Sequence, residues 1–163
     1  MADRIRKAYR ATMPNTCTFD APYDEIVFAP TASKARWLIV SRLQDCGWFE
    51  TDTGKAFAAV RVHRAPRYDT VLPPEHPVVA DLTWQEKRAL IHAYGGTGAN
   101  AGYRDHYCTH AGNPTLVRLV ERGLMTGPVH GNPELWGEDT AFFYLNWMGL
   151  RVALSLQPTY PEG

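Results

Sequence analysis

The sequence has no excess of charge of either sign. Lys and Arg together number 17, as do Asp and Glu, so the formal net charge at neutral pH is zero. A neutral chain has no overall field that draws it to nucleic acid or to an anionic membrane. A nucleic-acid-binding role would therefore depend on a local cluster of basic residues.

Long apolar runs and paired cysteines are also missing. No segment approaches the roughly 18 consecutive apolar residues that a membrane-spanning helix needs. The three cysteines, Cys17, Cys46 and Cys108, are odd in number and widely spaced, which favours reduced thiols over a disulfide framework. The basic first residues are followed by no apolar run, so no secretory leader is indicated. We expect a soluble, intracellular protein without a membrane segment.

Apolar and proline residues indicate how the chain is organised. It has 163 residues, 45% of them hydrophobic, which is enough for one core of ordinary size or two small ones. Prolines gather between residues 65 and 81, where each one fixes φ and removes a hydrogen-bond donor. We expect an α+β protein with a β–α–β unit at 1–68, a Pro-rich linker at 69–81 and a second domain at 82–163.

Local patterns predict the elements of the first part. The run "YDEIVFA" (23–29) reads as a strand, and the following helix begins at Thr31 and ends at Gly47, with Cys46 among its apolar positions. Alternation in "AFAAVRVHR" predicts another strand, and one more is expected near "TCTFD". The basic stretch "RIRKAYR" is expected either to form a basic surface together with "RVHRAPR" or to be a solvated tail.

Capping signals predict the helices of the second part. Thr83 and Glu86 have the spacing of a capping box, and the helix that they open is expected to bury Trp84. A short helix is expected around residues 103–108, and Asn113 followed by Pro114 marks the start of the next one. Three helices and a hairpin, "GPVHGNPELWGEDTA", then lead into the final stretch.

In that final stretch, "FFYLNWMGLRVALSL", an aromatic strand pattern meets Asn146, which is expected to cap a last helix. Residues 82–156 resemble the winged helix-turn-helix family, through Leu119–Leu124 before the hairpin and Tyr144–Gly149 after it. Asn146 stands where that family usually has Thr. The resemblance implies that the third helix would enter the major groove of DNA and that the hairpin wing would follow the phosphate backbone.

A second resemblance concerns the whole chain. The stretches "VFAPTASKAR", "VRVHRAPRYD" and "RDHYCTHAGNPTLVRLVERGLM" are similar to those of small accessory proteins encoded by bacteriophages and prophages. This resemblance implies a place in the cytoplasm of a bacterial host cell. It also implies a host protein, or a host protein–nucleic-acid complex, as the partner.

Two patterns could carry chemistry. In "HYCTH", His106, Cys108 and His110 alternate, but they would converge on a metal only in an extended segment, whereas helical character is expected there. A small hydrolase using Cys108 and a nearby His is an alternative without a recognised catalytic signature. The loop "GGTGANAG" lacks the Lys-Ser/Thr ending of a phosphate-binding loop. We therefore expect no enzyme activity, no metal and no cofactor.

Arginines are the candidates for duplex-DNA binding. One group belongs to the expected winged-helix half and the other to the end of a strand in the first half, and together they are Arg104, Arg118, Arg122, Arg61, Arg64 and Arg67. The expected wing opposes this reading, because it contains three carboxylates and neither Lys nor Arg. Phosphate would be repelled by such a wing.

Protein recognition is the reading that the wing favours. Trp136 lies there among Gly, Pro and the acidic residues Glu134, Glu138 and Asp139, where the local sequence gives no reason for its burial. We expect a non-enzymatic protein that binds and modulates a host nucleic-acid-processing or defence complex. A winged-helix regulator of double-stranded DNA is the alternative, and the pattern leaves the oligomeric state open.

Overall fold

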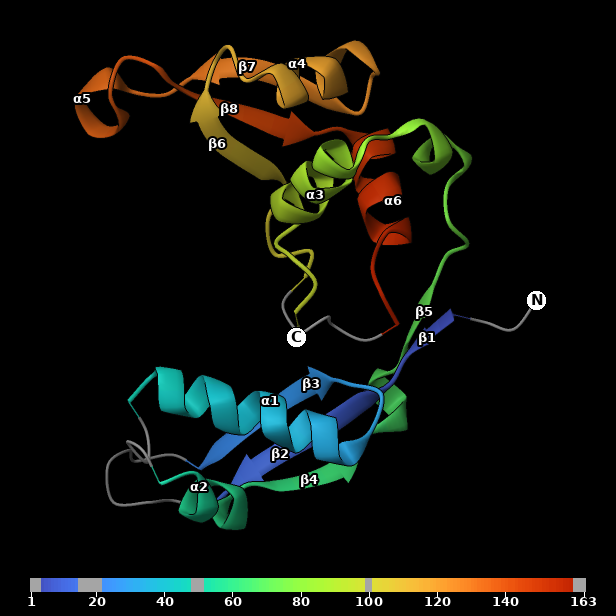
Figure 1. Cartoon of the computed structure of the whole chain (residues 1–163), viewed down its shortest axis with the longest axis vertical. Helices are drawn as coiled ribbons and strands as arrows, with labels where there is room; N and C mark the ends of the chain where they lie inside the picture. The colour runs from blue at the N-terminus through green and yellow to red at the C-terminus, as the bar shows by residue number, and fades with distance from the viewer. Residues whose placement is uncertain (1–3, 15–21, 48–51, 99–100, 160–163) are drawn as a thin grey trace. The chain divides into compact units, whose positions relative to one another are not determined.

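The computed structural model describes residues 4–14, 22–47, 52–98 and 101–159. The chain divides into two compact units, one formed by residues 1–72 with 158–163 and the other by residues 73–157 (Figure 1). Helices and small antiparallel sheets make up both units, so the fold class is α+β, as the sequence predicts. Among the described residues, none of the helices combines the length and apolar character that crossing a membrane requires.

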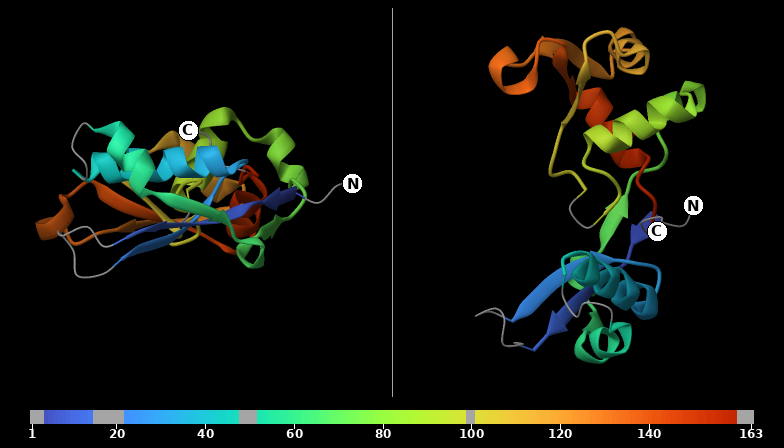
Figure 2. Two further views of the ribbon diagram at one scale, coloured as in Figure 1. Left: turned by 90° about the horizontal axis from the view of Figure 1, so that it is seen from below. Right: turned by 60° about the vertical axis from the view of Figure 1, so that its left-hand side comes forward.

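The first unit is built on a three-stranded antiparallel sheet of order β3-β2-β4. These strands are β2 (Ala8–Met13), β3 (Tyr23–Phe28) and β4 (Arg61–Arg64). Helix α1 (Ala32–Asp45) lies along one face of the sheet in all views (Figures 1 and 2). It buries Ala35 and Ile39 against Tyr9, Ala11 and Val27. A short helix α2 (Thr53–Ala59) precedes β4, and β1 (Arg4–Arg6) pairs with β5 (Thr70–Leu72).

Several expectations for this unit are wrong. The alternating run that predicts one strand holds α2 and then β4, because the Asp52 carboxylate caps the chain at Lys55 N and starts a helix. The basic N-terminal stretch forms β1 and β2 rather than a solvated tail. Cys46 is exposed at the end of α1 instead of buried. The strand expected near "TCTFD" lies outside the described residues.

The second unit places three helices against one face of a sheet of order β6-β8-β7. Its elements are α3 (Trp84–Ala93), β6 (His106–His110), α4 (Pro114–Glu121), β7 (Met125–His130), α5 (Pro133–Trp136), β8 (Thr140–Leu145) and α6 (Trp147–Ser155). The predicted caps are confirmed at Thr83, Asn113 and Asn146. Ahead of α3, the stretch predicted as a linker carries β5 and a 3-10 turn at Pro77–Asp81.

Two expectations for this unit are also wrong. A strand, β6, stands where a helix around residues 103–108 was expected, because His106–His110 pairs residue by residue with Tyr144–Thr140 of β8. Trp84 is 64% exposed, since α3 buries the side that carries Glu86, Ala89, Leu90 and Ala93. The sheet therefore has one more strand, and α3 one more exposed ring, than the sequence indicates.

Candidate protein-binding face

Strand β8 has one buried and one open side. Ala141, Phe143 and Leu145 point into the core beneath α3, α4 and α6, and the alternate residues Phe142 and Tyr144 point away from it. The pairing of β8 with β6 sets His106 opposite Tyr144, and the pairing with β7 sets Val129 opposite Phe142. Directly opposed residues share a face of an antiparallel sheet. The open side of this sheet therefore gathers aromatic and apolar side chains.

The rings on that side contact one another. Trp136 meets Phe142 edge to face with centroids 5.6 Å apart, and Phe142 stacks on Tyr144 at 6.5 Å. The His106 ring lies 5.9 Å from each of those two rings. We call this set, Trp136, Phe142, Tyr144, His106 and Val129, the aromatic face. Trp136 is 56% exposed, so its ring area is available to a partner.

The hairpin tip holds Trp136 in place. Asn132 caps α5 by accepting from Glu134 N, and the Thr140 hydroxyl donates to the Trp136 carbonyl oxygen. A Cβ at Gly131 would lie 3.0 Å from the Phe142 ring and 3.2 Å from the Trp136 ring, so a larger residue there would have to push these rings by a few tenths of an ångström. Figure 1 shows α5 at the far end of the β7–β8 hairpin. The tip is therefore a folded turn that presents the indole.

Carboxylates surround the indole in sequence and are open to solvent. Glu134, Glu138 and Asp139 are all exposed, and within the part of the chain that the structure describes none of them forms an ion pair. We call them the acidic trio. Unpaired charges on a loop create a negative potential that attracts a basic surface and repels phosphate.

The three arginines of the second unit that are candidates for DNA binding make contacts within the unit. Arg122 Nε lies 3.1 Å, and Arg118 Nε 3.5 Å, from Oε1 of the fully buried Glu86. Arg104 donates to the His92 carbonyl oxygen and packs on Tyr103. Arg118 and Arg122 thus share the carboxylate of Glu86, and its negative charge reduces the positive potential that they present to a phosphate backbone.

The other three arginines belong to the first unit. Arg64 donates to the Ala8 carbonyl oxygen at 2.8 Å and pairs with the Asp69 carboxylate, and these hydrogen bonds join β4 to β2 and to the segment before β5. That pairing lowers the pKa of Asp69. Arg67 lies over the Tyr68 ring at 4.6 Å, while Arg61 is exposed. The structure gives Arg64 a structural role and leaves Arg61 and Arg67 on the surface.

The catalytic and metal candidates on β6 are not assembled into a site. Cys108 is exposed, and no hydrogen bond joins it to a histidine in the described residues. His106 Nδ1 instead faces Asp105 Oδ1 at 3.3 Å. A search of the described residues finds no group of three His, Cys, Asp or Glu side chains placed to hold a metal ion.

The sequence singles out Trp136 and the acidic trio but not Phe142 and His106, which the structure places with Trp136 in one ring cluster. The signal for Phe142 was present, because alternation in "TAFFYL" puts it opposite to Phe143. The place of His106 depends on its pairing with Tyr144, 38 residues further along the chain, which no local pattern indicates.

The geometry defines an α+β protein with an open aromatic sheet face and an acidic hairpin tip. Comparison of the chain with protein-family models, with curated proteins and with solved structures finds no match. The function must accordingly be argued from this surface.

Proposed function

We propose that the chain is a non-enzymatic recognition protein that binds a partner protein through the aromatic face and the acidic trio. The observation that carries this proposal is the exposed Trp136 ring, held edge to face on Phe142, with exposed carboxylates two residues before it and two and three residues after it in the sequence. Exposed tryptophans on a rigid support are the residues that most often dominate interface energies. Carboxylates around such an anchor select a basic partner surface.

The resemblance to phage accessory proteins extends the proposal to the class of partner. A host nucleic-acid-processing or defence protein has basic surfaces that normally hold nucleic acid, and an acidic loop with a central indole could occupy one of them. The chain would then modulate that complex by covering its binding surface. The winged-helix assignment of residues 82–156 also stays a proposal, resting on the motifs quoted above.

Duplex-DNA binding is the competing function, and the side chains of Arg118 and Arg122 support it because they stay 46% and 35% exposed despite pairing with Glu86. Binding of this kind weakens steeply with salt, since each phosphate contact releases a counterion. Replacing Arg118 and Arg122 by Ala should then weaken DNA binding at every sequence and reduce the salt dependence. Replacing the acidic trio by amides should strengthen it.

The experiment that decides is affinity capture from bacterial lysate, followed by a binding measurement between purified components. We expect Trp136→Ala to weaken the partner complex by about 30-fold or more, as hot-spot tryptophans do. Converting the acidic trio to Gln and Asn should slow association. Trp37→Ala, which removes a 50% exposed indole of α1, is the matched control and should leave capture unchanged. The proposal would be refuted if substitutions at Trp136 and in the acidic trio left partner capture unchanged while substitutions at Arg118 and Arg122 weakened DNA binding.

A further inference from the structure

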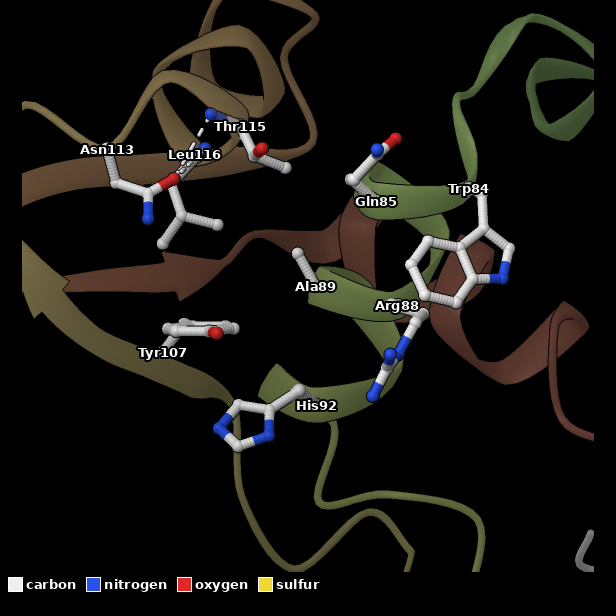
Figure 3. Close-up of a pocket in the computed structure, with 9 residues that line it drawn as sticks. All are labelled: Trp84, Gln85, Arg88, Ala89, His92, Tyr107, Asn113, Thr115 and Leu116. Carbon is white, nitrogen blue, oxygen red and sulfur yellow. Dashed lines mark hydrogen bonds between the residues drawn. The ribbon is translucent and has the colours of Figure 1, made fainter.

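A hollow lies in the second unit, outside the aromatic face and the hairpin tip. A pocket of about 340 Å³ opens between α3 on one side and β6 with the start of α4 on the other. We call it the α3 groove. Figure 3 shows Trp84, Arg88 and Gln85 on one side, Tyr107 and Asn113 on the other, Ala89 between them and His92 at one end. Its volume is in the range of small-molecule sites.

Flat rings line both sides of the groove. The Trp84 indole is 64% exposed, and the Arg88 guanidinium carbon lies 4.7 Å from its ring centroid. On the opposite side the Tyr107 ring packs against His92, with centroids 4.4 Å apart and planes tilted by 47°. Aromatic side chains that line a concave pocket supply the surfaces against which planar ligands pack. The rings are therefore available to a planar ligand.

The groove carries positive charge and no carboxylate. Among the residues that line it, Arg88 is cationic and His92 titratable, and the guanidinium of Arg104 donates to the His92 carbonyl oxygen from nearby. Partial burial lowers the pKa of His92, and the Coulombic effects of Arg104 and Arg88 lower it further. Glu86 of the same helix is buried on the other side, with Arg118 and Arg122. An anion entering the groove would meet a positive potential.

Two side-chain amides complete the lining. Asn113 caps α4, and its Oδ1 accepts from Thr115 N at 3.1 Å and from Leu116 N at 3.2 Å. These bonds fix the orientation of the amide and leave its NH₂ group as a donor at the edge of the groove (Figure 3). Gln85 supplies a second amide from the facing helix. Amides of this kind pair with the edges of heterocyclic bases.

We propose that the α3 groove binds a nucleotide unit, with the base against the rings of Trp84 and Tyr107 and the phosphate at Arg88 and His92. Stacking surfaces, base-pairing amides and a single cationic end occur together, which is the combination that single nucleotides and single strands require. An acidic peptide would use the charge of Arg88 but neither ring face. The groove therefore favours a nucleotide over a peptide carboxylate.

Calorimetric titration of the full chain tests the inference with defined probes. Adenosine 5′-monophosphate should bind more tightly than adenosine or inorganic phosphate alone, because base and phosphate contacts add. An oligonucleotide of about eight residues separates the two sources of this chemistry. If it binds at least about tenfold more tightly than the mononucleotide, the natural ligand is a single strand, and equal affinity indicates a free nucleotide. A peptide rich in Glu and Asp is the counter-probe.

The variants assign the binding to the groove. Trp84→Ala should weaken nucleotide binding about tenfold by removing a stacking surface. Arg88→Ala should weaken it and reduce the salt slope by about one. Lys87→Ala, which removes a neighbouring charge, and Trp147→Ala, which removes a 73% exposed indole, are the matched controls. Trp136→Ala should also leave nucleotide binding unchanged, so this result is independent of the proposed protein partner.

Three outcomes would overturn the inference. The first is that neither nucleotide nor oligonucleotide produces heat or a chemical-shift change at concentrations up to about 10 mM. The second is that Trp84→Ala and Arg88→Ala leave nucleotide binding intact. The third is that the acidic peptide binds more tightly than the nucleotides. Trp84 and Arg88 lie on the exposed side of α3, so both variants should stay folded. Circular dichroism of each variant checks this.

Discussion

Gly149 shows how a single residue fits the last helix to the rest of its unit. It is fully enclosed in the first turn of α6, where an added Cβ would lie 1.9 Å from the Leu124 carbonyl oxygen. Asn146 holds the start of α6 close to the same turn. Its backbone N–H donates to the Leu124 carbonyl oxygen, and its side-chain amide donates to the Gly123 carbonyl oxygen at 2.8 Å. The start of α6 therefore rests directly on the turn between α4 and β7.

We expect Gly149→Ala to destabilise the protein by about 3 kcal/mol or more, although alanine is the better helix former, because the clash is with backbone and no rotamer relieves it. Urea denaturation measures the loss. Gly112→Ala is the control, since its nearest neighbour would be His110 Nδ1 at an ordinary 3.8 Å. A Gly149→Ala protein as stable as the Gly112→Ala protein would contradict this account of α6.

At the residue scale, what the sequence predicts depends on how local the cause is. The caps at Thr83, Asn113 and Asn146 were predicted because the side chain that accepts and the N–H that donates lie within three residues of each other. The sequence puts Trp84 on the buried side of its helix because it recurs with Leu90, Ile91 and Tyr94 at helical spacing. Its exposure depends on which side of α3 packs against α4 and α6, and this is decided by tertiary packing rather than by local sequence.

Among elements, the link between α3 and α4 depends on one carboxylate. Glu86 accepts from the backbone N–H and the hydroxyl of Thr83 at 2.7 and 2.8 Å, and its other oxygen faces Arg118 and Arg122 of α4. Burial raises the pKa of Glu86, but the hydrogen bonds from Thr83 and the charge of Arg122 outweigh burial, and the net pKa is lowered. The charged form is thus the one that the fold prefers.

This shift gives a pH dependence of known sign. Because the folded pKa of Glu86 lies below its unfolded value, its contribution is complete above the ordinary carboxylate range and is lost as the pH falls through the folded pKa. We expect Glu86→Gln to cost about 2 kcal/mol at neutral pH. The difference from the parent protein should shrink on acidification.

Urea denaturation at a series of pH values measures both effects. Glu121→Gln is the control, since it removes an exposed carboxylate of α4 that forms no ion pair among the described residues. It should change stability little at any pH. A Glu86→Gln protein whose deficit stays constant, or grows, in acid would show that the charge of Glu86 does not stabilise the contact between α3 and α4.

Apart from the short helices α2 and α5, whose caps Asp52 and Asn132 are local, the elements that the sequence does not predict depend on distant pairing. The run "HYCTH" holds the strand-favouring Tyr107 and Thr109 but lacks a pattern of apolar residues, and β6 forms because β8 offers it a complete ladder. Likewise, β1 and β5 have three residues each and pair across more than 60 positions. The candidate face follows the same rule. Its anchor, Trp136, could be read from the sequence, but the ring cluster around it required the register of the sheet.

For the whole molecule, the two units have separate cores and opposite charge. One core draws its residues from positions 9–62 and the other from positions 78–156. Residues 73–157 contain 6 basic and 8 acidic residues, a balance of −2, and the rest of the chain contains 11 and 9, a balance of +2. The zero net charge of the chain thus hides a slightly acidic unit that carries the aromatic face and a slightly basic unit.

Because no buried residue in the described parts of the chain belongs to both cores, we expect each unit to open as its own cooperative unit. Ile39→Ala and Leu119→Ala each delete a fully buried side chain, one in each core. Hydrogen exchange should rise about 100-fold in α1, β2 and β3 for the first variant and in α3, α4 and α6 for the second, with the other unit unchanged. If either substitution accelerated exchange in both units equally, the chain would unfold as one body and separate cores would not mean separate stability.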